Sequence, residues 1–247
     1  MIELRNVWKK LGGQDVLRGV TLQVARGKTF VIVGPSGTGK SVTLQHMVGL
    51  LTPDDGEVLI DGENIHRARG AALEHIRDKF GVLFQSGALI NWMNVFENVG
   101  LPLMEKTDLA YTEILAAVRE KLAMVGLEGI EQKMPAELSG GMRKRVGLAR
   151  AIVRHPSIVL YDEPTSGLDP VTARHIDRLI QDLQGRLGVT SVVVTHDLHS
   201  AFTVGDEVAM LYQGAIVEVG TPNQFRASSH PFVREFIESQ FGGSSGA

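Results

Sequence analysis

The sequence predicts an α/β fold built on a mainly parallel sheet, and three observations support this prediction. Apolar runs rich in β-branched residues at 157–161 and 190–195 are typical of parallel strands that are buried on both faces. A helix expected at 170–186 lies between them, as the strand–helix–strand unit of a parallel sheet requires. A glycine-rich segment at 34–41 joins a third apolar strand to a helix, and a helical insert at 86–155 interrupts the alternation.

The amino-terminal part of the chain predicts an antiparallel β-subdomain and the first elements of the core. Apolar stretches alternate there with glycine-rich turns, and the turn at 53–56 precedes a further strand. The expected elements are strands at 2–8, 16–24, 28–34, 56–60 and 79–84, and a helix at about 39–50.

The remaining elements complete a single predicted domain at 1–241. Apolar residues recur at helical spacing at 111–126 and 138–155, and strands at 207–212 and 215–220 form a hairpin through Gln213-Gly214. We expect a core at about 1–85 and 156–220, a helical subdomain at about 86–155, carboxy-terminal helices at about 221–241 and a flexible tail at 242–247.

The composition is that of a folded protein and excludes several functions. Of 247 residues, 43% are hydrophobic and 21% charged, which excludes a disordered chain. Lys and Arg number 25 and Asp and Glu 28, so charge gives no reason to expect nucleic acid as the main ligand. The lack of cysteine excludes disulfides and thiol catalysis. No apolar stretch approaches the roughly 20 residues of a membrane span, and no signal-peptide core is visible, so we expect a cytosolic location, free or docked.

The glycine-rich segment carries the pattern of a phosphate-binding loop. It follows an apolar strand and opens a helix, which is the context that the pattern G-x-x-x-x-G-K-[ST] requires. Glycines let main-chain N–H groups face phosphate oxygens, and the helix terminus adds partial positive charge. Lys40 would contact the β- and γ-phosphates, and the Ser41 hydroxyl would bind Mg²⁺. The predicted nucleotide-binding residues are Gly34, Pro35, Ser36, Gly37, Thr38, Gly39, Lys40, Ser41 and Val42.

Polar side chains follow three other predicted strands. Asp162 and Glu163 end the strand at 157–161, where Asp162 would hold Mg²⁺ through water and Glu163 would activate the attacking water. His196 ends the strand at 190–195 and would contact the γ-phosphate, and Gln85 would orient water or reach Mg²⁺. Each of these also has a plain alternative as an ordinary polar residue at a strand end.

A Ser-Gly-Gly segment opens the helix at 138–155. Ser139 is well suited to cap that helix, which is a sufficient local reason for a serine there. A cap does not need the glycine pair Gly140-Gly141, however, whereas a phosphate approaching exposed N–H groups does. The segment therefore predicts a second contact to nucleotide.

Together these motifs resemble those of ATP-binding-cassette (ABC) ATPases, over nearly the whole chain. The set occurs in family order as GPSGTGKS, Gln85, LSGGM, IVLYDE, Ser166-Gly167-Leu168-Asp169 and His196. The resemblance implies a P-loop NTPase with a RecA-like core, ATP and Mg²⁺ as ligands, and a head-to-tail homodimer. In that dimer Ser139, Gly140 and Gly141 would close over the ATP of the partner. Glu163 would be the base, with Mg²⁺ held by Ser41, Gln85 and Asp162. Asp169 would link the two sites, and it is also a good cap for the next helix.

One position departs from the family pattern. The family stacks adenine on an aromatic residue where this chain has Leu11. Trp8 lies three residues away along a strand and should face the other side. Leu11 and Val16 are therefore expected to offer only apolar packing to the base.

Among ABC proteins, the sequence favours the motor of a membrane transporter. Cassettes that act on DNA insert long coiled coils between the phosphate loop and the acidic motif, whereas one short helical insert fills the gap from Lys40 to Asp162 here. Translation-linked proteins carry two cassettes in tandem, and this sequence shows one. Arg143, Lys144 and Arg145 are expected on a solvated face of the signature helix. The apolar segment 86–99 is expected to pack mostly in its own lobe and partly against a partner.

Details within these motifs resemble the ATPases of Mla/Mce lipid transporters, with amino-acid importers as the nearest alternative. The similar segments are GPSGTGKSV, FQSGAL, MNVFENV, KLAMVGL and LSGGMRKRVGLARA. The resemblance implies lipid as cargo and, as partners, an integral permease, an Mce-domain lipid-binding protein and a small STAS-domain subunit. It also implies a peripheral position on the cytoplasmic face of the inner membrane.

Overall fold

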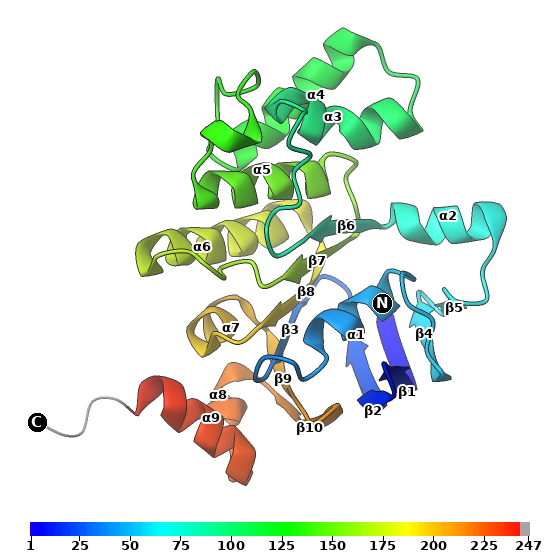
Figure 1. Ribbon diagram of the computed structural model, residues 1–247, viewed down its shortest axis with the longest axis vertical. Helices are drawn as coiled ribbons and strands as arrows, with labels where there is room; N and C mark the ends of the chain where they lie inside the picture. Colours follow the sequence, from blue (N-terminus) through cyan, green and yellow to red (C-terminus); the bar gives the residue numbers. More distant parts are fainter. Residues whose placement is uncertain (243–247) are drawn as a thin grey trace, which may run out of the picture. The chain divides into compact units, whose positions relative to one another are not determined.

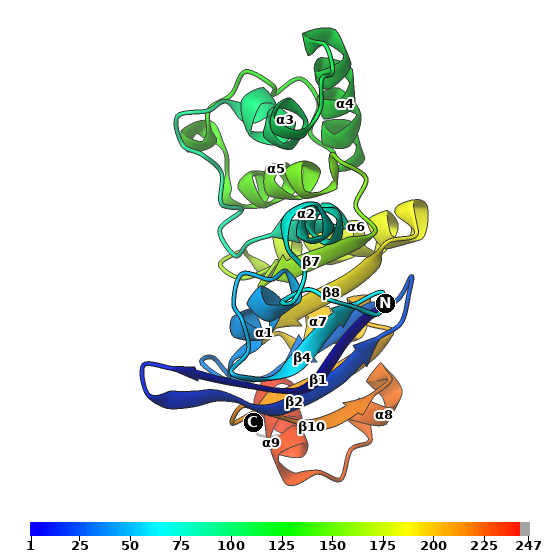
Figure 2. The ribbon, with the colours of Figure 1, turned by 90° about the vertical axis from the view of Figure 1, so that its right-hand side faces the viewer.

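The amino-terminal strands form a four-stranded antiparallel sheet. In the computed structural model, which describes residues 1–242, its strands are β1 (Ile2–Leu11), β2 (Gln14–Val24), β4 (Asp55–Ile60) and β5 (Glu63–Asn64), in the order β2-β1-β4-β5. Figure 2 shows β1 and β2 as a long hairpin. The predicted strands at 2–8, 16–24 and 56–60 are thereby confirmed, whereas β5 was not predicted because two residues carry no periodic signal.

A parallel group of strands belongs to the same compact unit, which comprises Met1–Arg77 and the chain from Thr190 onward. Strand β3 (Thr29–Val33) pairs in parallel with β8 (Thr190–Thr195) and with β9 (Glu207–Tyr212). Every residue of β3 and β8 is buried, as the continuous apolar runs predict. The predicted hairpin is present, since β10 (Ala215–Gly220) runs antiparallel to β9.

Helices also belong to this unit, and Figure 1 shows their places beside the strands. Helix α1 (Lys40–Met47) follows β3 and contacts β8, and α7 (Leu198–Val204) contacts β3 and β8. The chain continues through α8 (Pro222–Arg226) and α9 (Pro231–Phe241), the two short helices that were predicted. Of the tail predicted at 242–247, the residues after Gly242 lie outside the described part of the chain.

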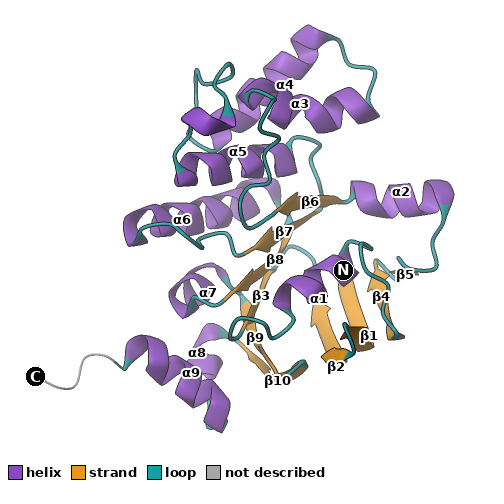
Figure 3. Ribbon diagram, in the orientation of Figure 1, coloured by secondary structure: helices purple, strands orange, loops and turns teal. Residues whose placement is uncertain are grey.

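The second unit, Asp78–Val189, holds two parallel strands and the helical insert. Strand β6 (Phe80–Leu83) pairs with β7 (Ile158–Asp162) so that Leu83 lies opposite Tyr161. Figure 3 shows the helices of the insert in purple. They are α3 (Val95–Lys106), α4 (Tyr111–Met124) and α5 (Gly140–Ile152), and α6 (Pro170–Leu187) follows β7.

Helices α2 and α7 were not predicted, and α3 was predicted only as part of the helical insert at 86–155. Helix α2 (Gly70–Asp78) buries only Ile76, so it has no apolar stripe that a search for helical spacing could detect. Helix α7 has seven residues, which is too short for a periodic pattern, although Asp197 caps its first turn.

Candidate functional site

The glycine-rich loop between β3 and α1 has the tight geometry that a phosphate cradle requires. A Cβ atom on Gly34 would lie 2.2 Å from the main-chain oxygen of Leu211. Gly39, which caps α1 with a φ of +101°, would place a Cβ 2.8 Å from Leu17. A side chain would collide with main chain at Gly34, and at Gly39 it would meet the Leu17 side chain in a left-handed conformation that favours glycine. Glycine therefore serves packing as well as turning N–H groups inward.

Lys40 directs its ammonium group into this loop. The Nζ atom donates hydrogen bonds to the main-chain oxygens of Gly34 at 2.8 Å and Pro35 at 3.0 Å, and the side chain is 6% exposed. Thr38 also donates to the oxygen of Pro35, at 2.9 Å. The loop is thus wrapped around a fixed positive charge at the first turn of a helix, which is an environment that favours phosphate.

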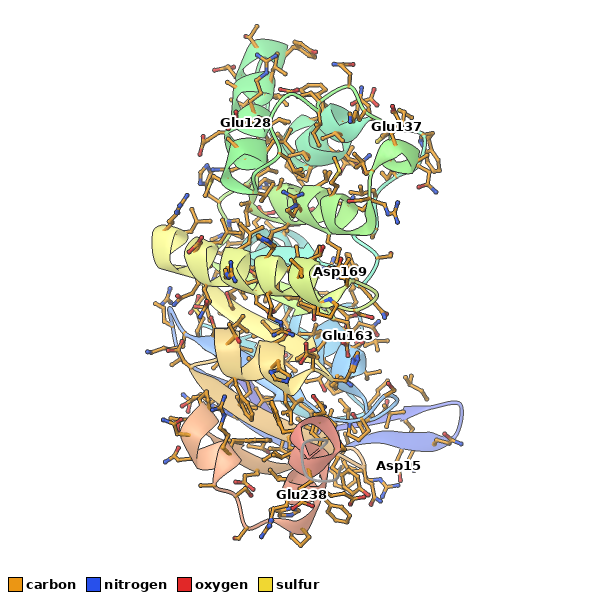
Figure 4. The ribbon with its side chains drawn as sticks, turned by 90° about the vertical axis from the view of Figure 1, so that its left-hand side faces the viewer. Asp15, Glu128, Glu137, Glu163, Asp169 and Glu238 are labelled. Atoms are coloured by element: carbon orange, nitrogen blue, oxygen red, sulfur yellow. The ribbon has the colours of Figure 1, made fainter. Side chains whose placement is uncertain are left out.

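A cavity of about 530 Å³ lies beside the loop within the same unit. Its lining includes Val16, one of the two residues predicted to pack on the base, but does not include Leu11. Sequence reasoning missed Arg18 and Tyr212, which carry no motif. The lining residues are Gln14, Asp15, Val16, Arg18, Pro35, Ser36, Gly37, Thr38, Tyr212, Gln213 and Gly214. Figure 4 shows Asp15 on the hairpin that forms one wall.

The strand that carries Trp8 and Leu11 is irregular. The pairing of β1 with β2 shifts register between Leu4 and Val7, again before Lys9, and again before Lys10. Each shift interrupts the alternation of faces, so counting residues from Trp8 to Leu11 does not establish which side either one faces. The indole nitrogen of Trp8 donates to Oδ1 of Asn6 at 3.1 Å.

His196 leaves the sheet beside the start of the phosphate loop. Val33, the last residue of β3, is paired with Thr195, the last residue of β8, in a parallel register. The next residues, Gly34 and His196, therefore emerge at the same edge from neighbouring strands, where ligands of parallel sheets bind. Within this unit the structure thus brings together the loop, Val16 and His196, and the His196 side chain is exposed.

Glu163 lies in the second unit, directly after β7, with an unusual backbone conformation. Its φ is +47°, a region that non-glycine residues rarely occupy, and the residue is 9% exposed. Its main-chain oxygen accepts hydrogen bonds from Nζ of Lys144 at 2.8 Å and from the N–H of Ser166 at 3.2 Å. Strained backbone of this kind clusters at functional sites when neighbouring contacts fix it.

Gln85 lies near the turn that follows Glu163. It comes two residues after β6, and its amide nitrogen donates to the hydroxyl of Ser166 at 3.4 Å. Because β6 and β7 are parallel neighbours, their carboxyl ends share one edge. The second unit therefore brings Gln85 together with the segment that carries Asp162 and Glu163.

Ser139 caps helix α5, as the plain interpretation predicted. Its hydroxyl accepts a hydrogen bond from the N–H of Met142 at 3.2 Å. The second glycine of the pair also has a packing reason that does not involve phosphate. A Cβ on Gly141 would lie 2.6 Å from Cγ2 of Thr172, so close packing between the starts of α5 and α6 already requires a glycine.

Asp169 caps α6 at the same place. Its carboxylate accepts from the N–H groups of Val171 and Thr172, both at 3.0 Å. Hydrogen bonding from Thr172, through its side chain first and its N–H second, lowers the pKa of the Asp169 carboxyl below its ordinary value. Figure 4 shows where Asp169 and Glu163 lie in the second unit. Since Gly141 packs on Thr172, the signature segment and Asp169 lie side by side.

The prediction of a solvated face for the three basic residues of α5 was wrong. Lys144 is 4% exposed and binds Glu163. The guanidinium of Arg143 donates to the main-chain oxygen of Leu138 at 2.7 Å, and that of Arg145 to the oxygen of Gly126 at 3.0 Å. Three consecutive residues spread over most of a helical turn, so they cannot share one exposed face.

The donor set predicted for Mg²⁺ suits that ion. A hydroxyl from Ser41, an amide oxygen from Gln85 and a carboxylate from Asp162 are hard oxygen ligands, which Mg²⁺ prefers. Among residues 1–242, no group of three or more His, Cys, Asp and Glu side chains could hold a metal ion. Mg²⁺ usually takes few protein ligands and completes its coordination with water and substrate phosphates, which a set of three such donors allows.

The apolar segment 86–99, which ends in the first turns of α3, is divided between core and surface. Val95, Phe96 and Val99 are buried in the helical insert, as expected for most of the segment. Trp92 is 79% exposed. The loop that presents it is held by buried Asn98, whose amide donates to the oxygens of three loop residues and accepts from the N–H of one. These contacts are to Ile90 O at 3.0 Å, Met93 O at 2.9 Å, Asn94 O at 3.0 Å and Ile90 N at 2.8 Å.

In the described part of the chain, every helix is too short or too polar to span a bilayer.

Comparison with known proteins gives a consistent assignment. A profile described as ABC transporter matches residues 17–166. The chain is 45% identical over 239 residues to the probable ribonucleotide transport ATP-binding protein mkl of Mycobacterium tuberculosis (strain ATCC 25618 / H37Rv), covering 97% of this chain and 67% of that protein. It is 41% identical over 238 residues to the intermembrane phospholipid transport system ATP-binding protein MlaF of Escherichia coli (strain K12), covering 96% and 88%.

A solved structure shares the fold. It is the dimeric ATP-binding cassette MJ0796 in a post-hydrolysis state bound to ADP and Pi, with a TM-score of 0.82 and 36% identity. The match covers 90% of this chain and 99% of that one. The family profile spans the phosphate loop, the signature segment and Glu163. The chain therefore belongs to the ABC transporter family and is one of its ATP-hydrolysing subunits.

Proposed function

We propose that the chain binds ATP with Mg²⁺ through its phosphate loop and hydrolyses it. Lys40 would hold the β- and γ-phosphates, and the residues that would hold the ion are Ser41, Gln85 and Asp162. The ion, when bound, neutralises charge on the phosphates. Glu163 accepts the proton of the attacking water, and His196 donates a hydrogen bond to the transferred phosphate.

The observation that carries this proposal is the register of two strands. Val33 lies opposite Thr195, so the phosphate loop and His196 start from neighbouring positions at one edge of the sheet. This placement supports a role for His196 at the phosphates rather than as an isolated strand-end histidine. The buried main chain of Glu163, held at a positive φ, supports a fixed catalytic group.

A second copy of the chain completes each site in this proposal. Ser139, Gly140 and Gly141 of one copy close on the ATP bound by the other, and Asp169 connects the two sites. The exposed hydroxyl-bearing start of α5 supports this arrangement, because a helix amino terminus favours phosphate. ATP favours the closed dimer, and hydrolysis allows it to open.

Three substitutions test the ATPase mechanism on the purified full chain. Lys40→Ala should lose ATP binding, measured with a fluorescent ATP analogue. Glu163→Gln should bind ATP like the wild type and lose turnover by about 100-fold or more, the scale of general acid–base catalysis. Ser139→Arg should abolish turnover while binding ATP in the monomer. If Glu163→Gln turns over like the wild type, Glu163 is not the base. If Ser139→Arg turns over like the wild type, the second copy does not contribute this segment to the site.

For the cargo, we propose a phospholipid or a related lipid. Support comes from the relative MlaF, which is named as part of an intermembrane phospholipid transport system and matches nearly the whole chain. In this proposal the chain sits at the cytoplasmic face of the cell membrane on an integral permease, with an Mce-domain protein and a STAS-domain subunit as further partners. The name of the relative mkl favours a second candidate, a transporter of a small polar solute such as a ribonucleotide.

Purification of the Glu163→Gln form from native membranes distinguishes the two cargoes. Proteins that co-purify would be identified by mass spectrometry, and bound lipid would be extracted and quantified. A permease with an Mce-domain protein and phospholipid is the expected result, and the Lys40→Ala form, which does not hold ATP, is the matched control. A permease with a soluble solute-binding protein would favour the polar solute instead. Recovery of no membrane protein would contradict the transporter assignment.

A further inference from the structure

The last turn of α9 binds the turn that carries His196. The side-chain amide of Gln240 donates from Nε2 to the main-chain oxygen of His196 at 2.7 Å. The N–H of Leu198 donates to Oε1 of the same amide at 2.8 Å. One side chain thus pairs with main-chain groups on both sides of Asp197, more than 40 positions away in the chain.

Hydrogen bonds within the turn also hold it. The N–H of Asp197 donates to the hydroxyl of Thr195 at 3.0 Å, and the Asp197 carboxylate accepts from the N–H groups of His199 at 2.8 Å and Ser200 at 3.3 Å. The Asp197 carboxylate thus caps α7, and the bond to Thr195 holds the N–H side of the peptide that follows His196. Gln240 supplies a partner for the carbonyl side of that peptide.

Aromatic side chains hold α9 against this region. The ring of Phe241 lies 4.4 Å from that of His199 and is stacked on Phe202 at 6.0 Å, with an angle of 12° between the planes. At the other end of α9, Phe232 stacks on Tyr212 at 4.2 Å. Tyr212 lines the cavity beside the phosphate loop. One helix therefore contacts both the wall of the nucleotide cavity and the His196 turn.

We propose that Gln240 is a positioning residue for His196 in ATP hydrolysis. The inference rests on the proposed role of His196 at the phosphates. Catalysis by a hydrogen-bond donor depends on holding it where charge develops, and a displacement of about 1 Å can cost on the order of 100-fold in rate. The two bonds from Gln240 fix the main chain from which the imidazole projects. Residue 240 lies beyond the part of the chain that the family profile matches, so no motif assigns it.

The test is a double-substitution experiment on the full chain. Steady-state and single-turnover ATPase rates and ATP-analogue affinity would be measured for the wild type, Gln240→Ala, His196→Ala and the double variant. Gln240→Glu is a second variant of similar size that keeps the acceptor but loses the donor. Glu235→Ala is the control, since Glu235 is exposed on the same helix. Thermal unfolding would be recorded for each protein.

Gln240→Ala is expected to lower kcat about tenfold, as for the loss of two hydrogen bonds, with ATP affinity within about twofold of the wild type. In the His196→Ala background the same change should alter the remaining rate by less than about twofold, because Gln240 acts through His196. Gln240→Glu should also be slow, and Glu235→Ala should match the wild type.

Two results would overturn the inference and are distinguishable from failure of the proposed function. If His196→Ala is slow while Gln240→Ala and Gln240→Glu turn over like the wild type, only the role of Gln240 is lost. If Gln240→Ala is equally slow with and without His196, α9 acts on turnover by another route and the positioning role is wrong. If His196→Ala itself turns over normally, the proposed role of His196 fails, and this inference fails with it.

Discussion

The ammonium group of Lys144 donates a hydrogen bond of 2.8 Å to the main-chain oxygen of Glu163. Lys144 lies on α5, the helix that Ser139 caps, and Glu163 follows β7. A buried cation therefore joins the helix of the signature segment to the backbone of the proposed base. In the proposed dimer these two segments of one chain serve different ATP molecules, so this contact provides a physical connection between the two sites.

We predict that Lys144→Met slows ATP hydrolysis about tenfold without weakening ATP binding. The substitution keeps the apolar stem but removes the donor that holds the Glu163 peptide at its positive φ. Stability should change little or rise, because a buried charge is costly. ATPase assays and ATP-analogue titrations on the full chain check this, with exposed Lys133→Met as control. Wild-type turnover of Lys144→Met would show that the contact is only structural.

The buried position of Lys144 also predicts a pH effect on stability. Burial lowers the pKa of Lys144 from 10.5 to about 8, although the charges of Glu163 and Asp162 oppose the shift. The unfolded chain therefore binds more protons than the folded one between about pH 8 and 10.5, so the free energy of unfolding should rise with pH there. Denaturant unfolding at pH 7.5 and 9.5 should show this rise in the wild type, with a smaller one in Lys144→Met. Equal pH dependence in both proteins would contradict it.

Gly141 should not tolerate a methyl group. An alanine there would place Cβ 2.6 Å from Cγ2 of Thr172, and such overpacking typically costs about 1–3 kcal/mol. Thr172→Ser removes that methyl, so Gly141→Ala should be neutral or stabilising in the Thr172→Ser background, since alanine favours helix over glycine. Thermal unfolding of the four proteins measures the coupling. If the double variant regains stability but its ATPase rate stays low, Gly141 also has a role at the nucleotide.

Buried His46 and half-buried His66 predict loss of stability in mild acid. His46 on α1 and His66 pack edge to face, with ring centroids 6.3 Å apart, and burial lowers the pKa of both. Around His46 the charges of Lys9 and Asp54 act in opposite directions, and Arg69 further disfavours charge on His66. The unfolded chain takes up protons near pH 6.5 before the folded one does, so the free energy of unfolding should fall as pH drops below 6.5. Unfolding at pH 7 and 5.5 checks this. His46→Gln should reduce the pH dependence, and exposed His75→Gln should not.

Trp92→Ala should weaken association with the membrane partner while leaving the isolated chain unchanged. The side chain is 79% exposed, so its removal should change the free energy of unfolding by less than about 0.5 kcal/mol. Exposed aromatic residues on an ordered loop are frequent anchors of protein interfaces. Co-purification of membrane proteins with Trp92→Ala would be compared with Leu109→Ala, another exposed apolar residue of this unit. Full recovery with Trp92→Ala would exclude this loop from the interface.

Sequence patterns predicted the strands, most helices and the phosphate loop because each of these depends on local periodicity or on a local motif. The apolar runs that became β3, β7 and β8 are buried over almost their whole length, which is why they are continuous. Ser139 and Asp169 cap helices as their residue types favour. The family resemblance added roles for these residues that no periodicity could supply.

The features that were missed depend on contacts between distant segments. The partner of Gln240 is a main-chain carbonyl, which leaves no trace in residue types. Lys144 stands in a run of three basic residues, and composition alone suggests a solvated surface there. Register shifts in β1 also interrupt the alternation of side-chain faces from which opposite orientations of Trp8 and Leu11 were predicted. The contacts of Gln240 and Lys144 arise from tertiary packing, which overrides such local rules.

The pairing of Val33 with Thr195 has a further consequence for how this protein can vary. The position of His196 beside the phosphate loop is determined by the number of residues in β8 rather than by any one of its side chains. Apolar residues of similar volume could therefore replace one another along β8 with small effect on turnover. Insertion or deletion of one residue would turn His196 toward the opposite face of the sheet. Strand β8 should therefore tolerate substitutions but not a change in its length.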